Sequence, residues 1–206
     1  MSRKLIAALA AVTVAALVGG TLGYVQMKRG QDPFADCRSS GIASAGAIGG
    51  PFTLMDEQGK PFTEKDLAAK PALVYFGYSF CPDVCPLDNT RNAEAVDLLA
   101  KMGLDVTPVF ISVDPDRDTP QVMAEFTDAM HPKMIGLTGT AEQVKAAANA
   151  YKVYYKKQDT GDQYYTMDHS TFTYLMLPGA GFVDFFNRDD TAQQMADRTA
   201  CFLGKG

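Results

Sequence analysis

Two cysteines in one short loop constrain the fold of this chain most strongly. Cys81 and Cys85 are separated by three residues, and each is followed by a proline. The apolar run 71–77 before them is typical of a buried strand, and apolar residues at helical spacing follow from Pro86 to about Met102. Because a residue before proline is disfavoured in the helical region, we expect both cysteines on extended or turn backbone, with Pro86 opening the helix.

This arrangement places two thiols at the positive end of a helix. The helix dipole lowers the pKa of a nearby thiol and favours the thiolate. Thiolate is the form that attacks disulfides and also the form that ligates metals, so the loop predicts a chemical site of one of these kinds. The competing interpretation is a structural disulfide between Cys81 and Cys85, or a chance pair of core cysteines.

The N-terminal segment predicts a membrane anchor. The stretch from Leu5 to Val25 contains no charged residue, and Arg3 and Lys4 precede it. Its length matches the roughly 20 residues that span a bilayer, and the basic flank places the N-terminus in the cytoplasm. A cleaved signal peptide is the alternative, since small residues are plentiful in this stretch.

Three parts follow from this pattern. We expect a cytoplasmic tip and single transmembrane helix over 1–28, a flexible linker over 29–47, and one folded domain over 48–206. A domain of this size has one core. The net charge of −5, without a basic cluster, disfavours nucleic acid and anionic lipid as partners.

The two other cysteines flank the domain. Cys37 precedes it and Cys201 lies near its end. An exported domain meets an oxidising compartment, and the ends of a domain often lie close together. We therefore expect a Cys37–Cys201 disulfide that closes almost the whole domain.

The remaining pattern alternates strands and helices. A polar turn joins 52–55 to 60–63 as a short hairpin, and a second hairpin is inserted with Tyr154-Tyr155 and 163–165 as its strands. The other expected elements are strands at 106–113, 134–137, 172–177 and 181–186 and helices at 119–130, 140–151 and 191–202. This order predicts an α/β, thioredoxin-like three-layer domain with an N-terminal β-hairpin and an inserted hairpin.

One position departs from thioredoxin-like oxidoreductases. They carry a cis-proline opposite the dithiol, but no proline occurs here between Pro132 and Pro178. Asp168-His169-Ser170 stands in its place, so His169 faces the cysteine loop in such a layout. His131, the other histidine, precedes a proline at a helix end and is interpreted as structural.

Two thiolates and one imidazole form a metal-binding set. Soft thiolates select Cu(I), while the imidazole also accommodates Cu(II). Zinc remains an alternative if Asp168 or water supplies a fourth ligand. The polar segment 114–120 follows the neighbouring strand, where turn and capping chemistry competes with a role for Asp114 or Asp118 in positioning the site or recognising a partner.

The motifs together resemble a known family. The run from Gly77 to Pro86, the segment from Val113 to Pro120, and Asp168-His169-Ser170 are similar to those of the Sco/SenC/PrrC family of cytochrome oxidase assembly proteins. The resemblance implies copper held by Cys81, Cys85 and His169. It also implies delivery of that copper to the binuclear copper centre of cytochrome c oxidase subunit II.

Two functions stay open at this point. The first is a copper metallochaperone anchored in the bacterial inner membrane, with its domain in the periplasm; other copper chaperones and a thiol reductant are further expected partners. The second is a thiol-disulfide oxidoreductase in which Cys81 and Cys85 reduce the cysteines of that target or of other exported proteins. The two differ in whether His169 is needed.

Overall fold

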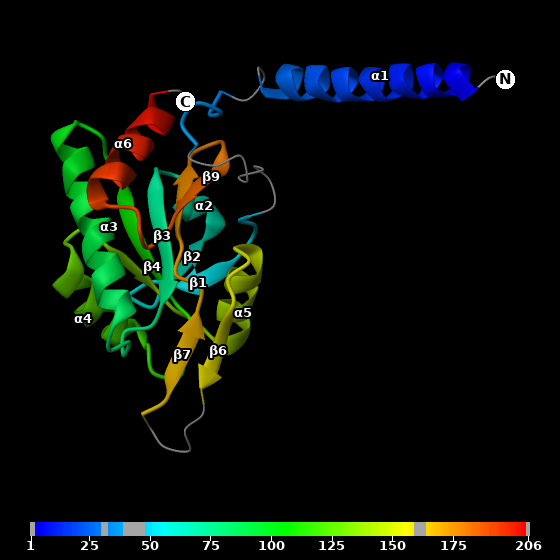
Figure 1. Cartoon of the computed structure of the whole chain (residues 1–206). Helices are drawn as coiled ribbons and strands as arrows, with labels where there is room; N and C mark the ends of the chain where they lie inside the picture. Colours follow the sequence, from blue (N-terminus) through cyan, green and yellow to red (C-terminus); the bar gives the residue numbers. More distant parts are fainter. Residues whose placement is uncertain (1–2, 30–32, 39–47, 159–163, 205–206) are drawn as a thin grey trace.

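A five-stranded mixed sheet forms the centre of the domain (Figure 1). The computed structural model describes residues 3–29, 33–38, 48–158 and 164–204. The strand order is β5-β4-β3-β8-β9; β3, β4 and β5 are parallel, and β8 and β9 are each antiparallel to their neighbours. The strands are β3 (Ala72–Gly77), β4 (Thr107–Ser112), β5 (Ile135–Leu137), β8 (Thr173–Leu177) and β9 (Gly181–Phe186).

Helices cover both faces of the sheet, as the three-layer prediction requires. One face carries α3 (Val84–Lys101), α4 (Pro120–Met130) and α6 (Ala192–Leu203); the other carries α5 (Ala141–Ala150) and the hairpin of β1 (Thr53–Met55) and β2 (Pro61–Thr63). Alternation along β3 supplies both faces: Leu73 joins the cluster of α3 and α6, whereas the Phe76 ring lies 5.2 Å from that of Tyr151 after α5. A short helix, α2 (Glu64–Leu67), is an element that the sequence pattern did not predict.

Threonines cap three of the helices. The side chains of Thr119, Thr140 and Thr191 accept bonds from the backbone N–H groups three residues later, at 3.2–3.3 Å. Each bond satisfies an N–H group that has no partner within the helix. The starts of α4, α5 and α6 are therefore set by local sequence.

Helix α3 begins earlier than expected. It starts at Val84, so Cys85 lies in the first helical turn and the expectation of extended or turn backbone is wrong for this residue. The first N–H groups of a helix have no intrahelical acceptor, so Pro86 costs no hydrogen bond there. The N–H of Cys85 instead faces Cys81 Sγ at 3.4 Å, which ties the loop to the helix start. Cys81 itself lies in the loop, as predicted.

The inserted hairpin is present, but its second strand lies further along the chain than expected. β6 (Tyr155–Gln158) pairs with β7 (Thr166–His169), whereas the sequence favoured 163–165 for the second strand. Residue 163 and the turn glycine at 161 lie outside the described residues. The register is explained by burial, because Met167 points into the core while Thr166 and Asp168 are exposed. This register places His169 opposite Tyr155.

The structure confirms the disulfide between Cys37 and Cys201, which joins residues 164 positions apart. Cys37 is buried in the apolar cluster that also contains Leu73 and Phe202. Figure 1 places the C-terminal end of α6 and the start of α3 at opposite ends of the domain. The disulfide therefore closes the end of the domain that lies away from the cysteine loop.

The N-terminal segment forms one helix, α1 (Arg3–Arg29). Its stretch Leu9–Met27 has a mean hydropathy of 1.6, long and apolar enough to cross a membrane by length and composition. Among the described residues it is the only helix that meets this criterion.

Candidate metal centre

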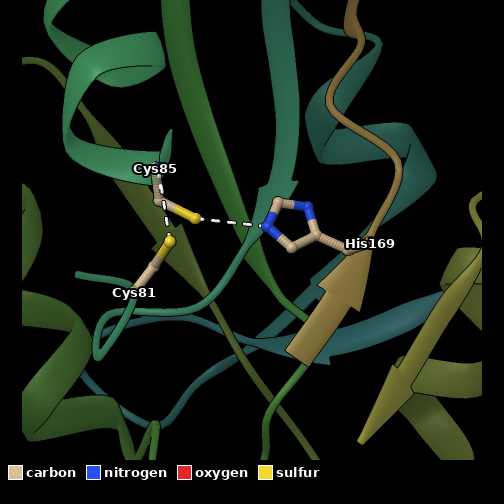
Figure 2. A group of neighbouring side chains, drawn as sticks. All are labelled: Cys81, Cys85 and His169. Atoms are coloured by element: carbon tan, nitrogen blue, oxygen red, sulfur yellow. Dashed lines mark hydrogen bonds between the residues drawn. The ribbon is translucent and has the colours of Figure 1, made fainter. Parts of the chain in front are cut away.

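Three side chains from separate elements meet at one end of the sheet (Figure 2). Cys81 comes from the loop after β3, Cys85 from the first turn of α3, and His169 from the last position of β7. Their two sulfurs and a ring nitrogen all lie within 4.8 Å of one another. Cys85 Sγ is 3.3 Å from His169 Nε2. The chain therefore brings together the three residues that the sequence singled out.

A buried carboxylate holds the cysteine loop. Asp118 is fully buried, and its oxygens accept hydrogen bonds from the Ser79 backbone N–H at 3.1 Å and from the Ser79 hydroxyl at 2.5 Å. The Ser112 hydroxyl donates to the same carboxylate at 2.5 Å. Burial raises the pKa of Asp118 despite these bonds. Asp118 thus fixes the loop to the end of β4.

Gly77 gives the Cys85 side chain its space. A Cβ atom at this position would lie 2.9 Å from Cys85 Sγ and 2.9 Å from Phe110 Cε2. Both distances are shorter than a carbon side chain tolerates without displacement of its neighbours. The glycine that ends β3 is therefore required by the position of the sulfur.

The backbone sets the orientation of His169. Its Nδ1 lies 2.9 Å from the carbonyl oxygen of Ser170, and a carbonyl only accepts, so Nδ1 carries the proton. Nε2 then presents its lone pair toward the sulfurs, as a metal-binding imidazole does. The rings of Tyr75 and Tyr78 meet the imidazole edge to face at 6.1 and 5.9 Å between centroids.

The two thiols differ in acidity. Hydrogen bonding with Cys85 lowers the pKa of Cys81 well below that of an ordinary thiol, against the opposing effect of burial, and the N–H groups of Cys85 and Asp83 act in the same direction. The same interaction with Cys81, together with burial, raises the pKa of Cys85. The protein therefore favours a thiolate on Cys81 and a thiol on Cys85 in the absence of metal.

The donor set fits a soft, thiophilic cation. Two thiolates and one imidazole suit copper, and zinc would need a further ligand. Asp168 does not fill that place: its side chain is exposed on the opposite face of β7 and accepts a hydrogen bond from Gln158. The fit rests on these donors and their spacing.

His131 lies apart from the site. Its Nδ1 accepts a bond from the Lys133 N–H at 3.0 Å and its Nε2 is 3.4 Å from Asp97, at the end of α4. These contacts agree with the structural interpretation.

Two residues that contact the site, Arg117 and Tyr165, were not identified from the sequence. Arg117 and Tyr165 join the segment 114–120 to the hairpin that carries His169, and Asp114 bonds both of them at 2.5 and 2.7 Å. Their contacts form only when the β6–β7 hairpin folds back over the end of β4. The nearest sequence signal was the clustering of aromatic and charged residues beside the predicted ligands.

Comparison with known sequences settles the family. The sequence profile of the SCO1/SenC family matches residues 41–204. The protein SenC of Rhodobacter capsulatus is 54% identical over 203 residues, which are 98% of this chain and 92% of that protein. This chain belongs to the SCO1/SenC family.

Solved structures of other SCO1/SenC proteins share the fold. The crystal structure of Arabidopsis thaliana ScoI with copper bound is 44% identical, with a TM-score of 0.73, and the match covers 77% of this chain and 99% of that one. The structure of Bradyrhizobium japonicum ScoI with copper bound is 42% identical, with a TM-score of 0.69 over 75% and 98% of the two chains. The thioredoxin-like fold predicted from the sequence is confirmed by these relatives.

Proposed function

We propose that this protein binds one copper ion through Cys81, Cys85 and His169 and delivers it to the binuclear copper centre of cytochrome c oxidase subunit II. The observation that carries the proposal is the convergence of two sulfurs and one imidazole nitrogen within 4.8 Å. Family relatives that are 44% and 42% identical have been solved with copper bound, which supports copper as the cargo.

The unequal thiols suit a site that both captures and releases its cargo. The Cys81 thiolate binds first, since the pKa of this thiol is lowered. Cys85 follows by giving up its proton, and His169 Nε2, which lies 3.3 Å from Cys85 Sγ, supplies the third ligand atom. With three protein ligands, an incoming thiolate from an acceptor replaces them one at a time, so the ion is never free in solution.

The proposed location follows from the anchor. Helix α1 spans the bacterial inner membrane with the N-terminus in the cytoplasm, and the folded domain that follows it faces the periplasm. Protease added to intact spheroplasts tests this orientation. Digestion of the domain is the expected result, and protection of the domain until the membrane is broken would contradict it.

Metal analysis tests the copper site. The full chain in detergent, loaded with Cu(I) under reducing conditions, is expected to retain one copper per chain. X-ray absorption is expected to give two sulfur ligands and one nitrogen ligand. Bound copper without a nitrogen ligand would contradict the proposal. So would a protein that retains more zinc than copper per chain after exposure to both metals.

A second function is favoured by the free dithiol. The Cys81 thiolate attacks a disulfide of an exported partner, forms a mixed disulfide and expels one partner thiolate. Cys85 then gives up its proton and attacks Cys81, which expels the second partner thiolate and leaves a Cys81–Cys85 disulfide. The partner gains two electrons and the dithiol loses two, and an exported thiol reductant restores it. This reaction requires both cysteines but not His169, so the two functions separate in variants at His169.

A further inference from the structure

Arg117 lies between the two parts of the metal site. It follows β4, whereas Cys81 and Cys85 follow β3 and His169 ends β7. Its side chain is 18% exposed, so most of the guanidinium is covered by neighbouring groups. These neighbours come from both the cysteine loop and the histidine hairpin.

One side of the guanidinium is held by the hairpin. Nη1 donates to the Tyr165 carbonyl oxygen at 3.0 Å, and the guanidinium lies 3.7 Å from the centre of the Tyr165 ring. Nε donates to Asp114 Oδ2 at 2.5 Å, while the Tyr165 hydroxyl donates to Asp114 Oδ1 at 2.7 Å. A hydrogen-bonded triad of Arg117, Asp114 and Tyr165 therefore links the segment after β4 to the start of β7.

The other side contacts the cysteine loop. The guanidinium lies 5.0 Å from the centre of the Phe80 ring and 5.6 Å from that of Tyr78, within the range of cation–π interaction. Phe80 directly precedes Cys81 in the chain. The Tyr78 ring continues the contact, because it meets the His169 ring at 5.9 Å between centroids.

Only an arginine satisfies all of these contacts at once. Its planar guanidinium stacks on aromatic rings with its faces while its edges donate in fixed directions to a carboxylate and a carbonyl. A lysine keeps the positive charge but concentrates it on one nitrogen, which cannot lie over several rings and bond both acceptors. The geometry therefore depends on the shape of the group as well as on its charge.

We propose that Arg117 is a positioning residue that locks the cysteine loop against the hairpin carrying His169, so that the imidazole stays within binding distance of the two sulfurs. The functional role of Arg117 rests on the proposed copper function. The geometric content of the proposal concerns the metal-free protein as well, because the contacts of Arg117 are with Asp114, Tyr165, Phe80 and Tyr78 and not with the three proposed ligands.

The test compares Arg117→Lys with Arg198→Lys in the full chain. Arg198 is a matched control: it is also mostly covered at 16% exposure, pairs with Asp184 and Asp190, and lies 4.3 Å over the Phe186 ring. Cu(I) affinity is measured by competition with a chromogenic chelator. Arg117→Lys is expected to weaken binding about 10–100-fold, the usual cost of losing an outer-shell partner of a metal ligand, and Arg198→Lys is expected to leave it unchanged.

A double-mutant cycle separates positioning from general destabilisation. If Arg117 acts through His169, then Arg117→Lys should lose most of its effect on affinity when His169 is already alanine. Equal losses in the two backgrounds would mean that the substitution only damages the fold, and would overturn the proposal. Unchanged affinity in Arg117→Lys would also overturn it.

A metal-free measurement keeps this proposal separate from the copper proposal. In the reduced apo-protein, the ring protons of His169 lie against Tyr75 and Tyr78, so their NMR shifts report the position of the imidazole. Arg117→Lys is expected to move these signals toward those of an unstructured histidine, and unmoved signals would overturn the positioning role. If the wild-type chain binds no copper, the copper proposal fails, and the NMR result still decides the role of Arg117.

A second variant covers the case in which Arg117→Lys does not fold. Phe80 is 53% exposed, so Phe80→Ala leaves the core intact and removes one ring beside the guanidinium. A smaller shift of the His169 signals in the same direction is expected. The absence of any shift would count against the proposed contact between the loop and the hairpin.

Discussion

Cys85 Sγ and His169 Nε2 lie 3.3 Å apart, although the two residues are 84 positions apart in the chain. The contact joins the first turn of α3 to the last position of β7. The position of His169, the third proposed ligand, therefore depends on how the inserted hairpin folds onto the sheet.

Removal of the imidazole should abolish tight copper binding. His169→Ala leaves two sulfurs and is expected to weaken Cu(I) affinity by more than the roughly 10–100-fold that a lost outer-shell partner costs, while reduction and oxidation of the dithiol continue. Chelator competition and thiol titration measure the two properties. His131→Ala is the control, because His131 bonds only structural neighbours. Full-affinity copper in the His169 variant would contradict the three-ligand site.

A methyl group at position 77 should disturb both stability and the site. Gly77→Ala places a Cβ 2.9 Å from Cys85 Sγ and from Phe110 Cε2, so the sulfur must move or the strand must shift. We expect a loss of about 1–3 kcal/mol in the free energy of unfolding, as for other overpacked sites, and weaker copper binding. Urea unfolding measures the first effect. Gly204→Ala should change neither, because its Cβ would lie 3.5 Å from the Ala200 carbonyl oxygen, in ordinary contact.

The disulfide should contribute to stability without affecting the metal site. Replacing both Cys37 and Cys201 by serine removes a link between residues 164 positions apart. Loss of a native disulfide typically costs about 2–5 kcal/mol, so the midpoint of urea unfolding should fall clearly. Copper affinity should stay within error, since the disulfide and the cysteine loop lie at opposite ends of the domain (Figure 1). A parallel loss of affinity would show that the two ends are coupled.

Alkylation should reveal the unequal thiols of the metal-free protein. Because hydrogen bonding with Cys85 holds the pKa of Cys81 low, Cys81 is already a thiolate in mild acid. Its reaction with iodoacetamide should be nearly independent of pH from about 5 to 8, whereas a thiol of pKa about 8.5 slows about tenfold per unit below that value.

The control for this measurement is Cys85→Ala, which removes the hydrogen-bond partner. The pKa of Cys81 should rise in that variant, so its alkylation should accelerate with pH across the same range. Mass spectrometry assigns the modified cysteine. A steep pH dependence in the wild-type protein would refute the lowered pKa of Cys81.

Much of the fold could be predicted because its signals are local. Thr119, Thr140 and Thr191 each start a helix through a bond to a residue three positions later, and the apolar run 71–77 marks the buried strand β3 by its composition. The motif order also carried the family resemblance. Two predictions failed. Cys85 lies in the first turn of α3, where its N–H faces Cys81 Sγ. The second hairpin strand lies at Thr166–His169, where tertiary packing buries Met167.

The sequence by itself determined the chemistry of the site, because Cys81, Cys85 and His169 are recognisable by residue type and neighbours. Tertiary structure decided how they are held. Asp118 fixes the loop through Ser79, Gly77 leaves room for the sulfur, and Arg117 joins the loop to the hairpin. These contacts join residues from different strands and loops, and no spacing along the chain encodes which of them will meet. The identity of the proposed ligands is therefore local information, whereas their geometry is a property of the folded domain.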